Sequence, residues 1–366
     1  MRLFCTLMLV GSGCAFGDDT PGTEPPSTSR PDIDDPDGLV DVVPFITEVC
    51  DQRNWELTPD TKNLDVSVAA TQSGATVFTV PKDGGAVRGF RIDGRGELFD
   101  RDMIAIRDDR NYTGVSASSA ADRLVVASQI DDKVALDIVR DDLGARFGLG
   151  DFTGTLVTPV MEVGNTQVAI TGGSAGLVAN GFSGATWQAL PAVELTKSSI
   201  VSMAAMPFLD DVMLAWSTET HQCHIQQLST RSESVHDFGC EQARIAVHPF
   251  GKIGMLVFVE DGNIYRSDLE IGAVNQLTSK VRIADAARSP RVAYDGERFW
   301  ISYIDAHGAA VVGFVDNDGR LNSRGLDTVP TVDDAYDLAV FNGGVWIVGM
   351  NDDAFDGRRV CAVPAR

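Results

Sequence analysis

Seven short apolar segments recur along this chain at a nearly constant spacing. Each is rich in β-branched and aromatic residues, and successive segments start 42 to 47 residues apart. The segments begin at Thr76, Arg123, Thr166, Val212, Gly254, Arg298 and Val345. None of them shows apolar residues at steps of three and four, which argues against a helical repeat. A steady period in the mid-forties with strand-like segments favours a β-propeller, in which each repeat forms one four-stranded blade.

The order of strands and turns within one repeat is visible in the stretch 291–323, RVAYDGERFWISYIDAHGAAVVGFVDNDGRLNS. Short apolar runs are joined by turns of Gly, Asp and Asn, as in consecutive antiparallel strands. The most apolar run of each repeat lacks alternation, which is typical of a strand buried on both faces, here between neighbouring blades. We therefore predict an all-β fold: one seven-bladed β-propeller of four-stranded antiparallel blades, over residues 42–366.

The two ends of the repeat region predict how the ring closes. The last repeat ends with its third strand, RRVCAVPAR, whereas the segment VVPFITEVC at 42–50 precedes the first repeat and has none of its own. We predict that this N-terminal segment supplies the outer strand of the last blade. Cys50 and Cys361 would then lie on paired strands and form a disulfide. Closing so long a loop stabilises by roughly 5 kcal/mol in the chain-entropy model, which is disputed.

A second cysteine pair is predicted within the fourth blade. Cys223 and Cys240 flank a turn near Arg231 and Ser232, and in a hairpin centred there they lie opposite each other on the third and fourth strands. The alternative for all four cysteines is a set of buried free thiols. His221, Cys223 and His224 also suggest a soft metal site, but zinc needs a free thiolate, so the disulfide argues against it.

The N-terminus indicates export. Residues 1–14, MRLFCTLMLVGSGC, combine one Arg with an apolar run and small residues, as in a secretion signal. GSGC resembles the lipobox of bacterial lipoproteins, which implies lipid attachment at Cys14. An ordinary signal cleaved after Gly17 is the alternative. Residues 15–41 are dominated by Pro, Asp, Ser, Thr and Gly, so we expect a disordered tether. We therefore expect a lipoprotein of the cell envelope, in the outer membrane or periplasm. The alternative is a secreted protein.

The charge of the chain restricts its partners. The formal net charge is -22, with 52 acidic against 30 basic residues. Phosphates would be repelled by such a protein, so nucleic acid is not expected as a partner. No segment after the signal reaches the ~20 apolar residues of a membrane span, so membrane contact is expected only through the lipid anchor. We expect a monomer.

Acidic side chains gather in one class of loop. In a propeller the loops between second and third strands share a face with the connections between blades. A candidate binding rim on this face comprises Asp131, Asp132, Asp305, His307, Asp352 and Asp353. Converging carboxylates would focus a field that attracts a basic partner or calcium, the one cofactor considered. The opposing interpretation is that surface loops are polar in any case.

Linear motifs identify no catalytic residue. There is no H-E-x-x-H helix or phosphate-binding Gly loop. The segment NGFSGATW is similar to the Asp-box of sialidase-like propellers, but Asn180 and Phe182 replace its Ser and its essential Asp.

The repeat length and strand order resemble the broad class of seven-bladed propellers found in exported and surface-tethered bacterial proteins. The resemblance implies a binding or scaffold module that recognises a protein or a glycan through a loop face. The alternative is a propeller hydrolase or lactonase, in which carboxylates at the channel mouth hold a catalytic calcium ion.

Overall fold

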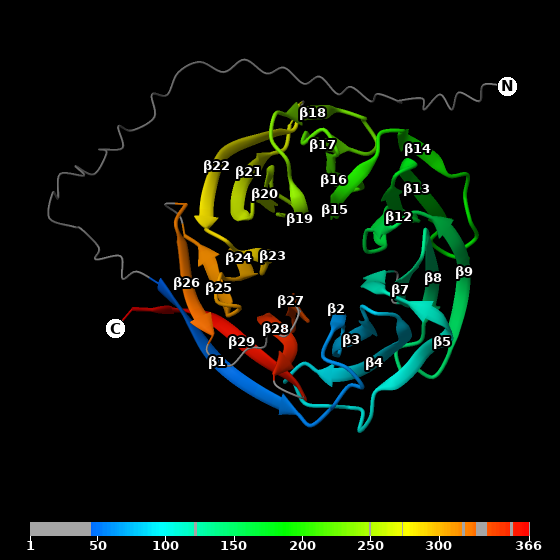
Figure 1. Ribbon diagram of the computed structural model, residues 1–366, viewed down its shortest axis with the longest axis vertical. Coiled ribbons are helices and arrows are strands. Elements are labelled where there is room, and N and C mark those ends of the chain that lie inside the picture. The colour runs from blue at the N-terminus through cyan, green and yellow to red at the C-terminus, as the bar shows by residue number, and fades with distance from the viewer. Residues whose placement is uncertain are drawn as a thin grey trace, which may run out of the picture. The chain divides into compact units, whose positions relative to one another are not determined.

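The computed structural model describes residues 45–120, 123–248, 250–272, 274–316, 319–326, 335–351 and 354–365, without the side chains of Ser279 and Asn351. This part of the chain folds as seven antiparallel sheets arranged in a ring (Figure 1). The predicted seven-bladed β-propeller is thereby confirmed. The predicted signal, with Cys14, and the tether at 15–41 lie outside the described residues. Within the described ranges no helix has the length and apolarity needed to cross a membrane.

The blades follow one another in chain order, each with its innermost strand first. Blades 1 to 3 consist of β2 (Leu64–Thr71), β3 (Gly74–Pro81), β4 (Gly85–Asp93) and β5 (Ile104–Tyr112); β6 (Gly114–Ala120), β7 (Arg123–Ile130), β8 (Lys133–Val139) and β9 (Arg146–Thr153); and β10 (Leu156–Val157) with β11 (Met161–Val163), β12 (Thr166–Gly173), β13 (Gly176–Ser183) and β14 (Val193–Thr196). Blades 4 and 5 consist of β15 (Ile200–Phe208), β16 (Asp211–Thr218), β17 (Cys223–Gln227) and β18 (Glu233–His236); and β19 (Glu241–Val247), β20 (Ile253–Glu260), β21 (Asn263–Glu270) and β22 (Gln276–Ala284). Blades 6 and 7 consist of β23 (Arg288–Tyr294), β24 (Phe299–Ile304), β25 (Ala310–Val315) and β26 (Leu321–Leu326); and β27 (Tyr336–Phe341), β28 (Gly344–Asn351), β29 (Ala354–Pro364) and β1 (Phe45–Trp55).

The second strand of each blade carries the apolar segment that sets the sequence period. In β16 every residue is buried, and β3 is buried over all but its last residue. A strand in this position has a neighbouring blade on each face, so polar side chains are excluded from both. Seven hydrophobic clusters of described residues result, one at each interface between adjacent blades. The core is therefore a ring of interfaces, and Phe258, fully buried between blades 4 and 5, is one of its largest side chains.

The ring closes through the N-terminal strand. β1 pairs antiparallel with β29, which makes it the outer strand of blade 7, and the two strands lie side by side at the rim in Figure 1. The register shifts between Val49 and Asp51, so Cys50 sits at a bulge. It is bonded to Cys361, the residue paired with Glu48, across a Cα–Cα distance of 6.0 Å.

The second disulfide joins Cys223 to Cys240, but the predicted position of Cys240 is wrong. Cys223 pairs in the β17–β18 hairpin with His236, and β18 ends there. Cys240 lies in the connection to blade 5, with its Cα 5.4 Å from that of Cys223. The bond therefore ties the third strand of blade 4 to the start of the next blade. With its sulfur bonded, Cys223 is not a metal ligand, and His224 instead contacts Glu233 at 2.6 Å and stacks on Trp216.

Blade 3 differs from the others in its innermost strand. The strand is divided into β10 and β11, and the break contains Pro159, which has no N–H to donate to the ladder. The Thr158 hydroxyl bridges the gap by accepting a hydrogen bond from the N–H of Ile170 at 3.0 Å.

Candidate binding site at the mouth of the central channel

A cavity of about 390 Å³ lies along the axis of the propeller, lined by the innermost strands of all seven blades. A second cavity of about 290 Å³ adjoins it and shares five lining residues, namely Asp65, Leu156, Met203, Arg244 and Arg291. The shared residues are noteworthy because three of them are charged. Asp337 adds a fourth charged side chain to the larger cavity, and Lys82 a fifth to the adjoining one.

The topology places these charges at one end of the channel. Each innermost strand starts directly after the connection from the preceding blade, and Asp65 and Asp337 are the second residues of β2 and β27. Arg244 and Arg291 are the fourth residues of β19 and β23. Because strand direction alternates within a blade, this end of the channel faces the same side as the loops between second and third strands. The charged cluster and the predicted rim therefore belong to one face of the propeller.

The innermost strands are sheet edges whose free N–H groups need acceptors. Asp337 of blade 7 supplies one, accepting from the N–H of Val68 in blade 1 at 2.9 Å. Asp65 of blade 1 does the same for Val115 in blade 2 at 2.8 Å. Side-chain oxygens thus link the blades around the channel wall, which explains why carboxylates are tolerated there.

Arg291 is held by several partners at once. Its Nε donates to Asp337 at 3.2 Å, and its terminal nitrogens donate to the carbonyl oxygens of Pro290 at 3.1 Å and Tyr336 at 3.3 Å. The guanidinium also lies 5.1 Å from the centroid of the Tyr336 ring. Arg291 is therefore fixed in place as the link between blades 6 and 7.

Arg244 has a different environment. Its Nη1 donates to the carbonyl oxygen of Ala243 at 2.8 Å, and among the described residues it forms no ion pair. Burial lowers the pKa of Arg244 to about 10, and the positive charge of Arg291 acts in the same direction. At neutral pH Arg244 is still charged. It is a half-buried cation lining both cavities, and among the described residues only one of its five N–H donors makes a hydrogen bond, to a carbonyl oxygen.

Burial also changes the neighbouring carboxyl group. It raises the pKa of Asp65, against the lowering effects of the Val115 N–H and of Arg291. Burial therefore disfavours the charged forms of Arg244 and Asp65, whereas Tyr336 and Asp337 offset burial at Arg291 and raise the pKa of its guanidinium.

Of the predicted rim, the described residues Asp131, Asp132, Asp305 and His307 lie in turns on the same face. Asp131 and Asp132 are exposed in the turn between β7 and β8. Asp305 caps its own turn, accepting from the N–H groups of His307 and Ala309 at 2.8 Å each, while His307 points into solvent. Asp352 and Asp353 lie outside the described residues.

The calcium hypothesis gains no support from the placed carboxylates. Among the residues that the structure describes, no three His, Cys, Asp or Glu side chains form a group that could hold a metal ion. A calcium site that includes Asp352 and Asp353 stays a prediction.

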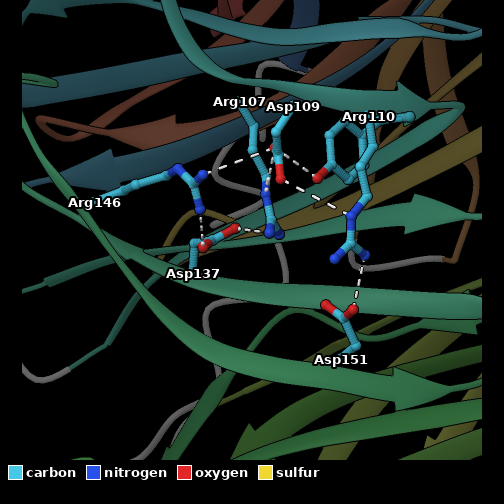
Figure 2. Close-up of polar contacts among 7 residues, drawn as sticks. Arg107, Asp109, Arg110, Asp137, Arg146 and Asp151 are labelled. Atoms are coloured by element: carbon cyan, nitrogen blue, oxygen red, sulfur yellow. Dashed lines mark hydrogen bonds and ion pairs between the residues drawn. The ribbon is translucent and has the colours of Figure 1, made fainter.

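A second charged cluster joins the outer strand of blade 1, β5, to the third and outer strands of blade 2, β8 and β9 (Figure 2). Asp137 of β8, with 1% of its side chain exposed, contacts Arg107 of β5 at 2.9 Å and Arg146 of β9 at 3.1 Å. Asp109 joins both arginines, and Arg110 pairs with Asp151 at 2.7 Å. Three arginines thus meet three aspartates. We call this cluster the outer ion-pair network. Because every charge in it has a partner, we assign it a structural role, which is to hold blades 1 and 2 together.

Sequence reasoning missed the channel residues, although a signal for them exists. Each is a charged residue placed immediately before an aliphatic residue of an innermost strand, as in NLDVSV, ARIAV, PRVAY and YDLAV. A charge that directly adjoins apolar residues of a channel-lining strand must occupy a special position. Comparison with protein-family models and with curated proteins finds no match for this chain.

Proposed function

We propose that this protein is an exported ligand-binding module whose site is the mouth of the propeller channel. The observation that carries the proposal is the channel cavity of about 390 Å³, into which charged side chains from different blades converge. That volume lies within the usual range for small-ligand sites, which combine a concave shape with a few placed polar groups.

The size of the cavity favours one kind of ligand. A single sugar unit or similarly small group fits a space of about 390 Å³, whereas a folded protein domain does not. We therefore favour the end of a glycan as ligand. A protein partner would instead contact the surrounding loops, including Asp131, Asp132 and Asp305. Its binding would then be unaffected by substitutions inside the channel.

The hydrolase or lactonase alternative needs carboxylates that converge on a calcium ion. In the described part of the channel mouth, Asp65 and Asp337 are each bonded to a strand N–H and are accompanied by arginines. Cations in this position compete with a metal ion for the carboxylates. This arrangement supports a binding module over a calcium-dependent enzyme.

Export and tethering rest on the predicted signal and on the two disulfides, which persist in oxidising compartments. The test is metabolic labelling with a palmitate analogue followed by cell fractionation. We expect label in the envelope fraction, lost in a Cys14→Ser variant. Unlabelled protein in the culture medium would favour ordinary signal cleavage.

The binding site is tested by blocking the channel. Ser116 lines the cavity on β6, so Ser116→Trp should fill part of it. Ser73→Trp is the matched control, because Ser73 is exposed in a first-to-second-strand turn on the opposite face. The purified full chain is screened by thermal denaturation against sugars, oligosaccharides and peptides. We expect hits that stabilise the parent and the control but not Ser116→Trp; equal stabilisation of all three would place the site elsewhere.

A further inference from the structure

We infer that the channel mouth recognises a carboxylate group, that of a sugar acid, and that Arg244 is the residue that contacts it. This inference rests on the proposed function and deepens it by giving the chemical class of the ligand. It depends on three features of the described residues: the charge balance, the free donors of Arg244, and the character of the cavity wall.

The charged side chains of the larger cavity are engaged unequally. Two cations, Arg244 and Arg291, line it with two carboxylates, Asp65 and Asp337. Asp337 is paired with Arg291 and Asp65 accepts from the N–H of Val115, so Arg244 is the cation that no described carboxylate contacts. Because this charge is half-buried between strands, solvent screens it less than a charge on the outer surface.

The spare hydrogen-bonding capacity belongs to Arg244. Arg291 is committed to Asp337 and to backbone carbonyl oxygens, whereas Arg244 donates to one carbonyl oxygen and, within the described ranges, pairs with no carboxylate. A guanidinium offers a planar pair of N–H groups that fits a carboxylate in two parallel hydrogen bonds. An incoming anion would also relieve the repulsion between Arg244 and Arg291.

The rest of the cavity selects among anions. One unpaired cation suits a monoanion, and the nearby carboxylates of Asp65 and Asp337 would repel the second charge of a phosphate. The wall also offers hydroxyl and amide groups from Ser67, Ser116, Thr155 and Gln129. Such groups complement the hydroxyls of a sugar. A sugar acid satisfies both requirements, as a free molecule or as the terminal unit of a longer acidic glycan.

The experiment measures binding of defined probes to the full chain by isothermal titration calorimetry at low ionic strength. Glucuronate is the main probe, glucose the neutral control, N-acetylalanine a peptide-like carboxylate, and inorganic phosphate the competing anion. A glucuronate-terminated oligosaccharide distinguishes a free sugar acid from a glycan end. The variants are Arg244→Met, Arg244→Lys, and Arg110→Met, which removes an exposed arginine of the outer ion-pair network; melting temperatures check that each is folded.

We expect glucuronate to bind and glucose not to bind. Arg244→Met should weaken glucuronate binding by about 30-fold or more, as for truncation of one partner of a buried charge pair. Arg244→Lys keeps the charge without the planar pair of donors and should fall between parent and Arg244→Met. Arg110→Met should bind as the parent does.

Several results would overturn the inference. These are equal glucuronate binding by the parent and Arg244→Met, tighter binding of phosphate, or binding of N-acetylalanine without glucuronate. Failure of the inference is distinguishable from failure of the proposed function. If a neutral ligand binds the parent but not Ser116→Trp, the channel is still the binding site, and only the inference that its ligand carries a carboxylate is wrong.

Discussion

The two charged clusters of this propeller are built from the same residue types but are balanced differently. In the outer ion-pair network three arginines meet three aspartates, and Asp137 is shared by two of them. At the channel mouth Arg291 pairs with Asp337, and Arg244 is left without an ion pair among the described residues. The first cluster is closed on itself and has nothing left to bind. The second has a charge and donors to spare.

The comparison separates stability from binding. A buried ion pair is costly to break because the remaining partner is left charged in a poorly solvated place. An unpaired cation already carries that cost in the folded protein, so its removal should relieve rather than create strain. Removal of the shared Asp137 and removal of the unpaired Arg244 should therefore change the free energy of unfolding with opposite signs.

The largest expected effect is in the outer ion-pair network. Asp137→Ala leaves Arg107, only 8% exposed, without its buried partner, and should lower the free energy of unfolding by about 3–5 kcal/mol. Urea denaturation followed by tryptophan fluorescence measures the change. As a control, replacing the pair together, by Arg107→Met with Asp137→Leu, should recover most of the loss. A loss below about 1 kcal/mol in Asp137→Ala would show that the pair contributes no more than a surface ion pair.

Removal of the unpaired cation should have the opposite sign. Arg244→Met eliminates the repulsion with Arg291 and the cost of burying the guanidinium, while keeping a long apolar side chain. We expect the free energy of unfolding to rise by about 1 kcal/mol, since the half-exposed channel position limits the gain. The same denaturation measurement checks it, with Arg291→Met as the contrasting variant. Because Arg291 supports Asp337, its loss should destabilise; destabilisation of equal size by both variants would contradict the distinction.

The pH dependence tests the carboxyl group at the channel mouth. Burial raises the pKa of Asp65 in the folded protein, so the folded state binds its proton more tightly than the unfolded chain does. The stability that this group contributes is present below its unfolded pKa and is lost as the pH rises through the elevated folded pKa. Asp65→Asn, which retains an oxygen for the Val115 N–H, should therefore be more stable than the parent at neutral pH, by on the order of 1 kcal/mol.

The stability difference between Asp65→Asn and the parent should shrink towards zero as the pH falls below the ordinary range for Asp, about 3.9. Chemical denaturation at a series of pH values measures it. A difference that grows on acidification would mean that the folded-state pKa of Asp65 is lowered.

The parts of the structure that could be predicted from sequence are those set by local rules. The second strand of each blade has two buried faces, so its apolar run is visible in sequence and fixes the period. The pairing of Cys50 with Cys361 followed from the incomplete last repeat. The predicted position of Cys240 was wrong because β18 is only four residues long and ends at His236. Nothing in the sequence marks this early end of the strand.

The channel cluster could not be predicted for a different reason. Asp65, Arg244, Arg291 and Asp337 come from four blades and lie far apart in the sequence. Only the closure of the ring brings them together. Their mutual balance, on which the binding proposal depends, is a property of the assembled propeller and not of any segment.

The smallest expected effect on stability is at the exposed end of the outer ion-pair network. Arg110 and Asp151 belong to the outer ion-pair network, but their side chains are 42% and 33% exposed. Solvent screens this pair, so Asp151→Ala should lower the free energy of unfolding by only about 0.2–1 kcal/mol, and less at high salt. Denaturation at low and high ionic strength checks both statements. If Asp151→Ala costs as much as Asp137→Ala, burial is not what separates them, and the network acts as a single cooperative unit whose exposed end is as important as its buried one.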